Sequence, residues 1–145
     1  HAERELGISY APLEQVVAES DTLCMLLPYY SATDMLLDAG LLSTMKVGAT
    51  LVSCGSGSVI DEAALANAVR EGHLAGAALD TFEYEPIRPD NPLLPLARDP
   101  NSNVLLTPHT AAGSSADADS DRTRKGDYTN LVRVLRGQAP LHRVA

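Results

Sequence analysis

The sequence lacks tryptophan, and its aromatic side chains are limited to five tyrosines and one phenylalanine. Its 145 residues are enough to bury a substantial hydrophobic core, and apolar residues make up 45% of the chain. We therefore expect a globular domain whose core is built mainly from leucine, valine and alanine. No apolar run approaches the roughly 18 residues that cross a membrane, so we expect no membrane-spanning segment.

Positive charge and cysteine are also scarce. Eleven lysines and arginines against nineteen aspartates and glutamates give a net charge of −8, which argues against a nucleic acid or an anionic membrane as a partner. The two cysteines, Cys24 and Cys54, both lie in apolar runs, and we expect buried free thiols of a cytoplasmic protein. Neither the cysteines nor the four histidines have the spacing of a zinc site, so we expect no metal.

Short apolar runs alternate with helical patterns along the chain. The runs at 23–27, 49–54, 74–79 and 104–106 are typical of buried strands. We expect helices at 13–20, 63–71 and 114–136, shorter helical pieces at 35–37 and 41–45, and a short strand at 7–10. This alternation predicts an α/β fold with a mainly parallel sheet and helices on both faces. Residues 1–137 are expected to form the domain and 138–145 an irregular tail.

The glycine-rich phosphate loop of a dinucleotide-binding unit is missing. Such a unit carries Gly-x-Gly-x-x-Gly between a strand and a helix, and no such pattern occurs here. Gly55-Ser56-Gly57 lacks the third glycine, and the helix after it begins only near Asp61. We interpret it as a tight turn. The expected fold is a partial doubly wound parallel sheet, Rossmann-like, without the N-terminal half of the nucleotide domain.

Polar or ionisable side chains follow two of the predicted strands. Asp80, Glu83 and Glu85 come after the run at 74–79, and Thr107 and His109 come after the run at 104–106. Ligands of open α/β sheets bind beyond the carboxyl ends of the strands, where a carboxylate and an imidazole could form an acid–base pair. On the residues alone, these side chains could equally be a solvated carboxylate, a turn aspartate and a surface histidine.

Several segments, taken in order, resemble a known family. They are Pro28 with Thr33, then residues 45–52, 57–65, 71–86, 91–93 and 103–109, the last reading Asn-Val-Leu-Leu-Thr-Pro-His. Together they are similar to the second half of the cofactor domain of the D-isomer-specific 2-hydroxyacid dehydrogenases. The resemblance covers about 6–137. It implies an oxidoreductase that moves hydride between NAD, with NADP not excluded, and a small 2-hydroxy or 2-oxo acid, and a homodimer when intact.

The resemblance also implies roles for single residues. His109 matches the catalytic histidine, Glu85 the glutamate that raises its pKa, and Asp80 the aspartate beside the nicotinamide carboxamide. The remaining positions implied to contact the cofactor are Leu27, Pro28, Thr33, Cys54, Gly55, Ser56, Ala111 and Ala112.

One departure concerns the substrate arginine. The family pattern Asn-x-x-Arg-Gly here reads Ser53-Cys-Gly-Ser56-Gly57, so that Ser56 occupies the third catalytic position. A hydroxyl cannot offer the charged, bidentate contact that an arginine gives a carboxylate. The loss would cost about 3 kcal/mol, or on the order of a hundredfold in rate, unless another cation such as Arg88 compensates. An alternative interpretation is therefore a catalytically degenerate, dinucleotide-binding sensor or interaction module.

Overall fold

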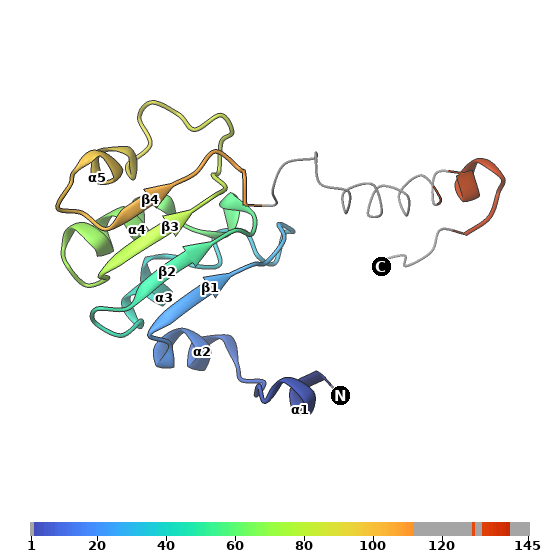
Figure 1. The fold of residues 1–145 in the computed structure, drawn as a ribbon, viewed down its shortest axis with the longest axis horizontal. Coiled ribbons are helices and arrows are strands. Elements are labelled where there is room, and N and C mark those ends of the chain that lie inside the picture. Colours follow the sequence, from blue (N-terminus) through green and yellow to red (C-terminus); the bar gives the residue numbers. More distant parts are fainter. Residues whose placement is uncertain (1, 112–128, 130–131, 140–145) are drawn as a thin grey trace. The chain divides into compact units, whose positions relative to one another are not determined.

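A computed structural model describes residues 2–111, 129 and 132–139 of the chain. The chain divides into two compact units, His1–Ala111 and Ala112–Ala145, of which the first contains the sheet. Figure 1 shows the course of the chain through this unit. No helix in the described residues is long and apolar enough to cross a membrane.

The first unit is organised around a four-stranded sheet. Its strands are β1 (Thr22–Met25), β2 (Thr50–Ser53), β3 (Gly76–Leu79) and β4 (Val104–Leu106). They lie in the order β1-β2-β3-β4, and every neighbouring pair is parallel (Figure 1). All four predicted strands and the parallel α/β fold are therefore confirmed. Because the strands run in one direction, the loops that follow them meet at one edge of the sheet.

The described part of the first unit contains six helical segments, of which those at 13–19, 39–43 and 62–70 lie near predicted helices. They are α1 (Ala2–Leu6), α2 (Leu13–Glu19), α3 (Ala39–Ser43), the 3-10 helix η1 (Gly57–Val59), α4 (Glu62–Arg70) and α5 (Leu94–Arg98). The carboxylate of Asp61 accepts hydrogen bonds from the N–H groups of Ala63 and Ala64 and so caps α4. Gly72 follows that helix with a φ of 73°, as expected of a terminating glycine.

The hydrophobic core lies on one face of the sheet. Leu23, Leu51 and Leu79 project from three neighbouring strands into one cluster with Val17 of α2 and Leu65 of α4. Right-handed crossovers that advance in one direction across a sheet place their helices on the same face. The expectation of helices on both faces is therefore not met in the described part of the chain.

Among the described residues no helix covers the opposite face of the sheet, and the exposure of the cysteine side chains agrees with this. Cys24 pairs in register with Val52 on that face, where Leu105 is 61% exposed. Cys24 and Cys54 are both free, as predicted, but both are exposed, so the expectation of buried thiols is wrong. An apolar run predicted burial on both faces, whereas only one face is covered here.

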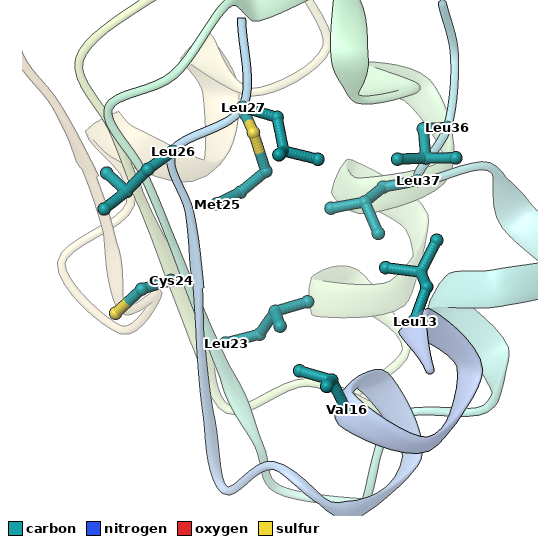
Figure 2. A pocket seen from close by; sticks show the side chains of 9 residues that line it. All are labelled: Leu13, Val16, Leu23, Cys24, Met25, Leu26, Leu27, Leu36 and Leu37. Atoms are coloured by element: carbon teal, nitrogen blue, oxygen red, sulfur yellow. The ribbon is translucent and has the colours of Figure 1, made fainter. Parts of the chain in front are cut away.

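An apolar cavity of about 250 Å³ lies beside β1. In Figure 2 Leu23 and Leu37 point into it, whereas Cys24 points away. Its lining is formed by Leu13, Val16, Leu23, Cys24, Met25, Leu26, Leu27, Leu36 and Leu37. Since this lining carries no carboxylate, imidazole or basic group, the cavity offers packing surface rather than acid–base chemistry.

Two predicted elements are not formed. Residues 7–10 make no strand, and Tyr10 is 84% exposed, because no neighbouring strand is available to pair with this segment. Residues 35–37 make no helix: Met35 has a φ of 48°, and Leu37 forms a parallel bridge with Ile60. Pairing with the chain around 58–60 replaces the hydrogen bonds that a helical turn would have made.

The second unit is described only in part. Residues 132–135 are helical, and Gly137 follows with a φ of 69°. Arg133 donates a hydrogen bond from Nε to the carbonyl of Ala139 at 2.8 Å. Most of the helix predicted at 114–136 lies outside the described residues. The predicted boundary between domain and tail at 137 stays a prediction.

Candidate active site

The loops that follow β1, β2 and β3 pack closely at the carboxyl edge of the sheet. The N–H of Ser56 donates to the Leu27 carbonyl at 2.9 Å, and the Thr81 hydroxyl donates to the Gly55 carbonyl at 2.5 Å. A Cβ at Gly57 would lie 2.0 Å from the carbonyl carbon of Phe82, so only glycine fits there. The loop after β2 is thus held between the other two.

The third predicted catalytic position, Ser56, lies in this loop and is half-buried. The side chain offers a neutral hydroxyl where the resembling family has a guanidinium. Arg88, the cation considered as a substitute, stacks on Tyr84 with 3.4 Å between its Cζ and the ring centroid. This cation–π contact engages the guanidinium face but leaves its N–H donors available.

Glu85 and His109 form a hydrogen-bonded pair. Glu85 Oε2 lies 2.8 Å from His109 Nδ1, although 24 residues separate the two in the sequence. The other carboxylate oxygen, Oε1, accepts the backbone N–H of Phe82 at 3.1 Å. Both side chains remain accessible, with 60% of the imidazole and 37% of the Glu85 side chain exposed. The pairing predicted from the resemblance is present in the structure.

Each side chain of the pair shifts the pKa of the other in the direction that favours its charged form. The hydrogen bond to Glu85, and then its negative charge, raise the pKa of His109 above its usual value, and Asp80 adds a smaller contribution. The hydrogen bond from His109, and then that from Phe82 N–H, lower the pKa of Glu85. An imidazolium beside a carboxylate is therefore favoured to higher pH than in an isolated histidine.

Asp80 anchors the segment that carries the histidine. Its Oδ1 accepts the Thr107 hydroxyl at 2.5 Å and the Thr110 N–H at 2.8 Å, and its Oδ2 accepts the Ala111 N–H at 2.9 Å. These bonds, the one from Thr107 first, lower the pKa of Asp80 and keep it ionised. His109 between them has a φ of 54°, a left-handed conformation that a non-glycine residue adopts only when its surroundings impose it.

Two other predicted positions contribute to the shape of the edge. Thr33 is buried, and its hydroxyl donates to the Pro28 carbonyl at 2.9 Å and accepts the Tyr30 N–H at 3.0 Å. Its polar group thus closes the loop after β1 rather than projecting from it. Ala111 lies at the end of the anchored segment, whereas Ala112 lies outside the described residues.

A cavity of about 360 Å³ opens against the acid–base pair. Besides the two ionisable side chains its lining is apolar, and consists of Phe82, Glu85, Pro86, Ile87, Pro108 and His109. In the described part of the chain no group of three or more His, Cys, Asp or Glu side chains could hold a metal ion. The site therefore places an imidazole that can transfer a proton beside an apolar surface.

Sequence reasoning assigned no role to three residues that build this site. Thr107 ties Asp80 to β4, while Glu62 and Asn91 bond each other beneath the loop that carries Glu85. Glu62 reads as an ordinary first-turn residue of a helix, and Asn91 as part of a proline-rich loop. No local pattern connects positions 29 residues apart.

The sequence and the structure both match known proteins. The model of the D-isomer specific 2-hydroxyacid dehydrogenase NAD-binding domain matches residues 1–111. A glyoxylate reductase of Korarchaeum cryptofilum is 41% identical over 140 residues, which are 95% of this chain and 40% of that protein.

Solved structures agree with this match. The chain superimposes on the NADPH-dependent glyoxylate/hydroxypyruvate reductase of Sinorhizobium meliloti, solved with NADP and malonate, with a TM-score of 0.78 and 34% identity over 96% of this chain and 41% of that one. The chain also superimposes on the D-lactate dehydrogenase of Aquifex aeolicus, complexed with NAD and lactic acid, with a TM-score of 0.79. The sequence identity is 28%, and the match covers 94% of this chain and 44% of that one.

The chain thus spans about 40% of the length of the glyoxylate reductase that it matches. The described unit agrees with this family in its sheet, and the matched residues include the anchoring Asp80 and the Glu85–His109 pair. The chain belongs to the D-isomer specific 2-hydroxyacid dehydrogenase family, as part of its NAD-binding domain.

Proposed function

We propose that the full-length protein is an oxidoreductase that transfers hydride between NAD(P) and a small 2-hydroxy or 2-oxo acid. The observation that carries this proposal is the hydrogen-bonded pair of Glu85 and His109 beside an apolar cavity at the carboxyl edge of a parallel sheet. Reduction of a 2-oxo acid needs a proton for the carbonyl oxygen, and a histidine with a raised pKa supplies one near neutral pH.

The geometry assigns the two imidazole nitrogens different tasks. Nδ1 faces Glu85, so Nε2 is the atom that gives its proton to the substrate oxygen in reduction and takes it back in oxidation. The Glu85 carboxylate compensates the charge of the imidazolium and fixes the ring. Asp80 accepts the N–H of His109 with its carbonyl and the N–H groups of the two following residues with its carboxylate, which keeps the ring at the edge of the sheet.

The described residues fit one end of a dinucleotide. When bound, the nicotinamide supplies the hydride. The tightly packed loops at the carboxyl edge and the apolar cavity suit a flat ring. We propose that Leu27, Pro28, Thr33, Cys54, Gly55, Ser56, Asp80, His109, Ala111 and Ala112 line the cofactor, as the family resemblance implies. The sequence carries no phosphate loop, so another part of the protein would bind the diphosphate.

Ser56 limits how this chain can hold a substrate carboxylate. It can donate one neutral hydrogen bond, so we propose that a cation from elsewhere in the protein, or Arg88, balances the substrate charge. The alternative of a degenerate sensor rests on Ser53 and Ser56 in place of the family's asparagine and arginine, and on the polar start of the predicted last helix. The relatives' names favour an enzyme, since they are glyoxylate reductases and 2-hydroxyacid dehydrogenases.

The direct test uses the full-length protein. Titration with NADH and NADPH should show saturable binding, followed by reduction of glyoxylate, pyruvate or hydroxypyruvate measured as loss of absorbance at the nicotinamide band. The variant His109→Gln should retain cofactor binding and lose at least about a hundredfold in kcat, typical of removing a general acid. Binding without turnover of any of these acids would refute the catalytic proposal and favour the sensor.

We also propose that the full-length protein is a homodimer. Leu6, Ile8 and Tyr10 are 70%, 57% and 84% exposed on the first segment of the chain, and exposed apolar side chains are typical of contact surfaces. Light scattering coupled to gel filtration should give twice the monomer mass. A molecular mass equal to that of the monomer at every protein concentration would contradict the proposal.

A cytoplasmic location is proposed from the two thiols. Cys24 and Cys54 are exposed and unpaired, which suits a reducing compartment. Fractionation of cells with an antibody to the protein should find it in the cytoplasmic fraction, and recovery in an oxidising compartment would contradict this.

A further inference from the structure

A buried carboxylate outside the acid–base pair lies beneath the loop that carries Glu85. Glu62, in the first turn of α4, is 8% exposed. Its Oε1 accepts the backbone N–H of Glu83 at 3.0 Å, and its Oε2 accepts Asn91 Nδ2 at 2.7 Å. The two oxygens thus hold both ends of the segment from Glu83 to Asn91.

Burial disfavours the ionised form of this carboxylate. Desolvation raises the pKa of Glu62, against the lowering effect of its bonds to Glu83 N–H and Asn91. The nearby charges of Glu83 and Asp61 act in the same direction as desolvation. Helix capping cannot account for the group, because Asp61 is the residue that caps α4. Its bonds go to the loop instead.

A short chain of bonds connects Glu62 to the imidazole. Glu83, whose N–H it accepts, is the residue after Phe82, whose N–H binds Glu85 Oε1. The second oxygen of Glu85 then meets His109 Nδ1. At the far end of the segment, Asn91 uses its Oδ1 to accept the Leu93 N–H at 2.9 Å, so Asn91 is itself fixed in orientation.

We propose that Glu62 is a positioning residue for the acid–base pair. By holding Glu83 and Asn91 it keeps the loop in the conformation that places the Glu85 carboxylate against His109. The consequence for catalysis rests on the proposed function, whereas the consequence for the imidazole does not. The other charged group that acts on His109 is Asp80, which directly follows β3 and bonds the Thr107 hydroxyl.

The bond pattern allows a sharp set of variants. In Glu62→Gln, the amide oxygen can still accept the Glu83 N–H, but the amide nitrogen then faces Asn91 Nδ2, so two donors oppose each other. A 180° rotation of the Asn91 amide would relieve this contact, but it would then place Asn91 Nδ2 against the Leu93 N–H, which is also a donor. The double variant Glu62→Gln with Asn91→Asp restores every bond, with donor and acceptor exchanged only between positions 62 and 91. Glu71→Gln, at the other end of α4, is the matched control.

The primary readout is the titration of the His109 imidazole by NMR in the full-length protein with labelled histidine. Loss of the signal in His109→Gln assigns it. We expect the pKa of His109 to fall in Glu62→Gln, to return toward the wild-type value in the double variant, and to stay unchanged in Glu71→Gln. Asn91→Ala removes the contact while Glu62 keeps its charge, and we expect the pKa to fall there also.

Kinetics separate this proposal from the proposed function. If the protein reduces 2-oxo acids, Glu62→Gln should lose roughly tenfold in kcat, with an alkaline limb at lower pH and a much smaller effect in the double variant. A protein without turnover would refute the proposed function and leave the NMR result to decide on Glu62. An unchanged His109 titration in folded Glu62→Gln and Asn91→Ala variants would overturn the proposal, whatever their stability.

Discussion

Asp80 holds His109 through both its backbone and its side chain. The Asp80 carbonyl accepts the His109 N–H at 2.8 Å, and the Asp80 carboxylate accepts the N–H groups of the two residues that follow the histidine. This arrangement explains how a non-glycine residue is kept at a φ of 54°. The left-handed turn projects the imidazole toward Glu85, so one aspartate sets the direction of the His109 side chain.

We expect Asp80→Asn to release the segment that follows β4. The amide side chain has one acceptor oxygen and no charge, so it cannot replace all three bonds of the carboxylate. Amide hydrogen exchange at Thr110 and Ala111 should be faster by on the order of tenfold. Asp90→Asn, an exposed aspartate in the neighbouring loop, is the control. Equal protection in both variants would show that the carboxylate does not anchor this segment.

We expect Glu85→Gln to shift the pH profile of 2-oxo acid reduction toward acid. Glu85 raises the pKa of His109, and the protonated imidazole is the form that donates in reduction. Without the carboxylate the imidazole loses its proton at lower pH, so the alkaline limb of kcat/KM moves down. Oxidation, which uses the neutral imidazole, should lose less at the same pH.

The matched control for this experiment is Glu83→Gln. Glu83 lies two positions before Glu85 and is exposed, and its only bond to Glu62 comes from the backbone, which the substitution preserves. Its pH profile should equal that of the wild type. A Glu85→Gln profile with an unshifted alkaline limb would mean that the observed pair does not set the titration.

The fold could be read from the sequence because it depends on local patterns. The four strands are short apolar runs between turn residues, and Asp61 and Gly72 mark the ends of α4 in the expected way. The exposure of Cys24 could not be read, because it depends on which face of the sheet the helices cover. The conformation of Met35 could not be predicted for a similar reason. Its backbone N–H donates to the Ser58 carbonyl, which is distant in the sequence, rather than to a residue of its own helical turn.

The site was predictable only where the family resemblance assigned a role to a residue. Glu85 and His109 on their own are an ordinary loop carboxylate and an ordinary histidine, and the resemblance gave them roles. Glu62 and Asn91 lie in segments that resemble the family, but the resemblance gave them no role, and a glutamate in a first helical turn and an asparagine before a proline are common on surfaces. Their contact depends on how the loop after β3 folds over α4, which no local pattern specifies.

We expect Gly57→Ala to destabilise the protein by about 1–3 kcal/mol, as overpacking does. The added Cβ would lie 2.0 Å from the carbonyl carbon of Phe82, and backbone atoms cannot move aside as a flexible side chain can. Urea unfolding measures the loss. Gly40→Ala in α3 is the control, since its Cβ would meet only the Asp38 side chain at 3.3 Å. Equal stability of the two variants would show that Phe82 can retreat from Gly57.

We expect Ser56→Arg to raise kcat/KM for 2-oxo acids in the full-length protein. Ser56 lies in the loop that Leu27 and Thr81 hold at the carboxyl edge, and the next residue, Gly57, approaches the backbone of Phe82, which lines the cavity of the acid–base pair. A guanidinium there would bind a carboxylate through two charge-assisted hydrogen bonds, so the gain should reach about a hundredfold if nothing else fills this role. Ser56→Gln provides a side chain with neutral donors and should give little gain. An unchanged rate in an active enzyme would contradict the expectation and locate the cation for the substrate carboxylate outside this loop.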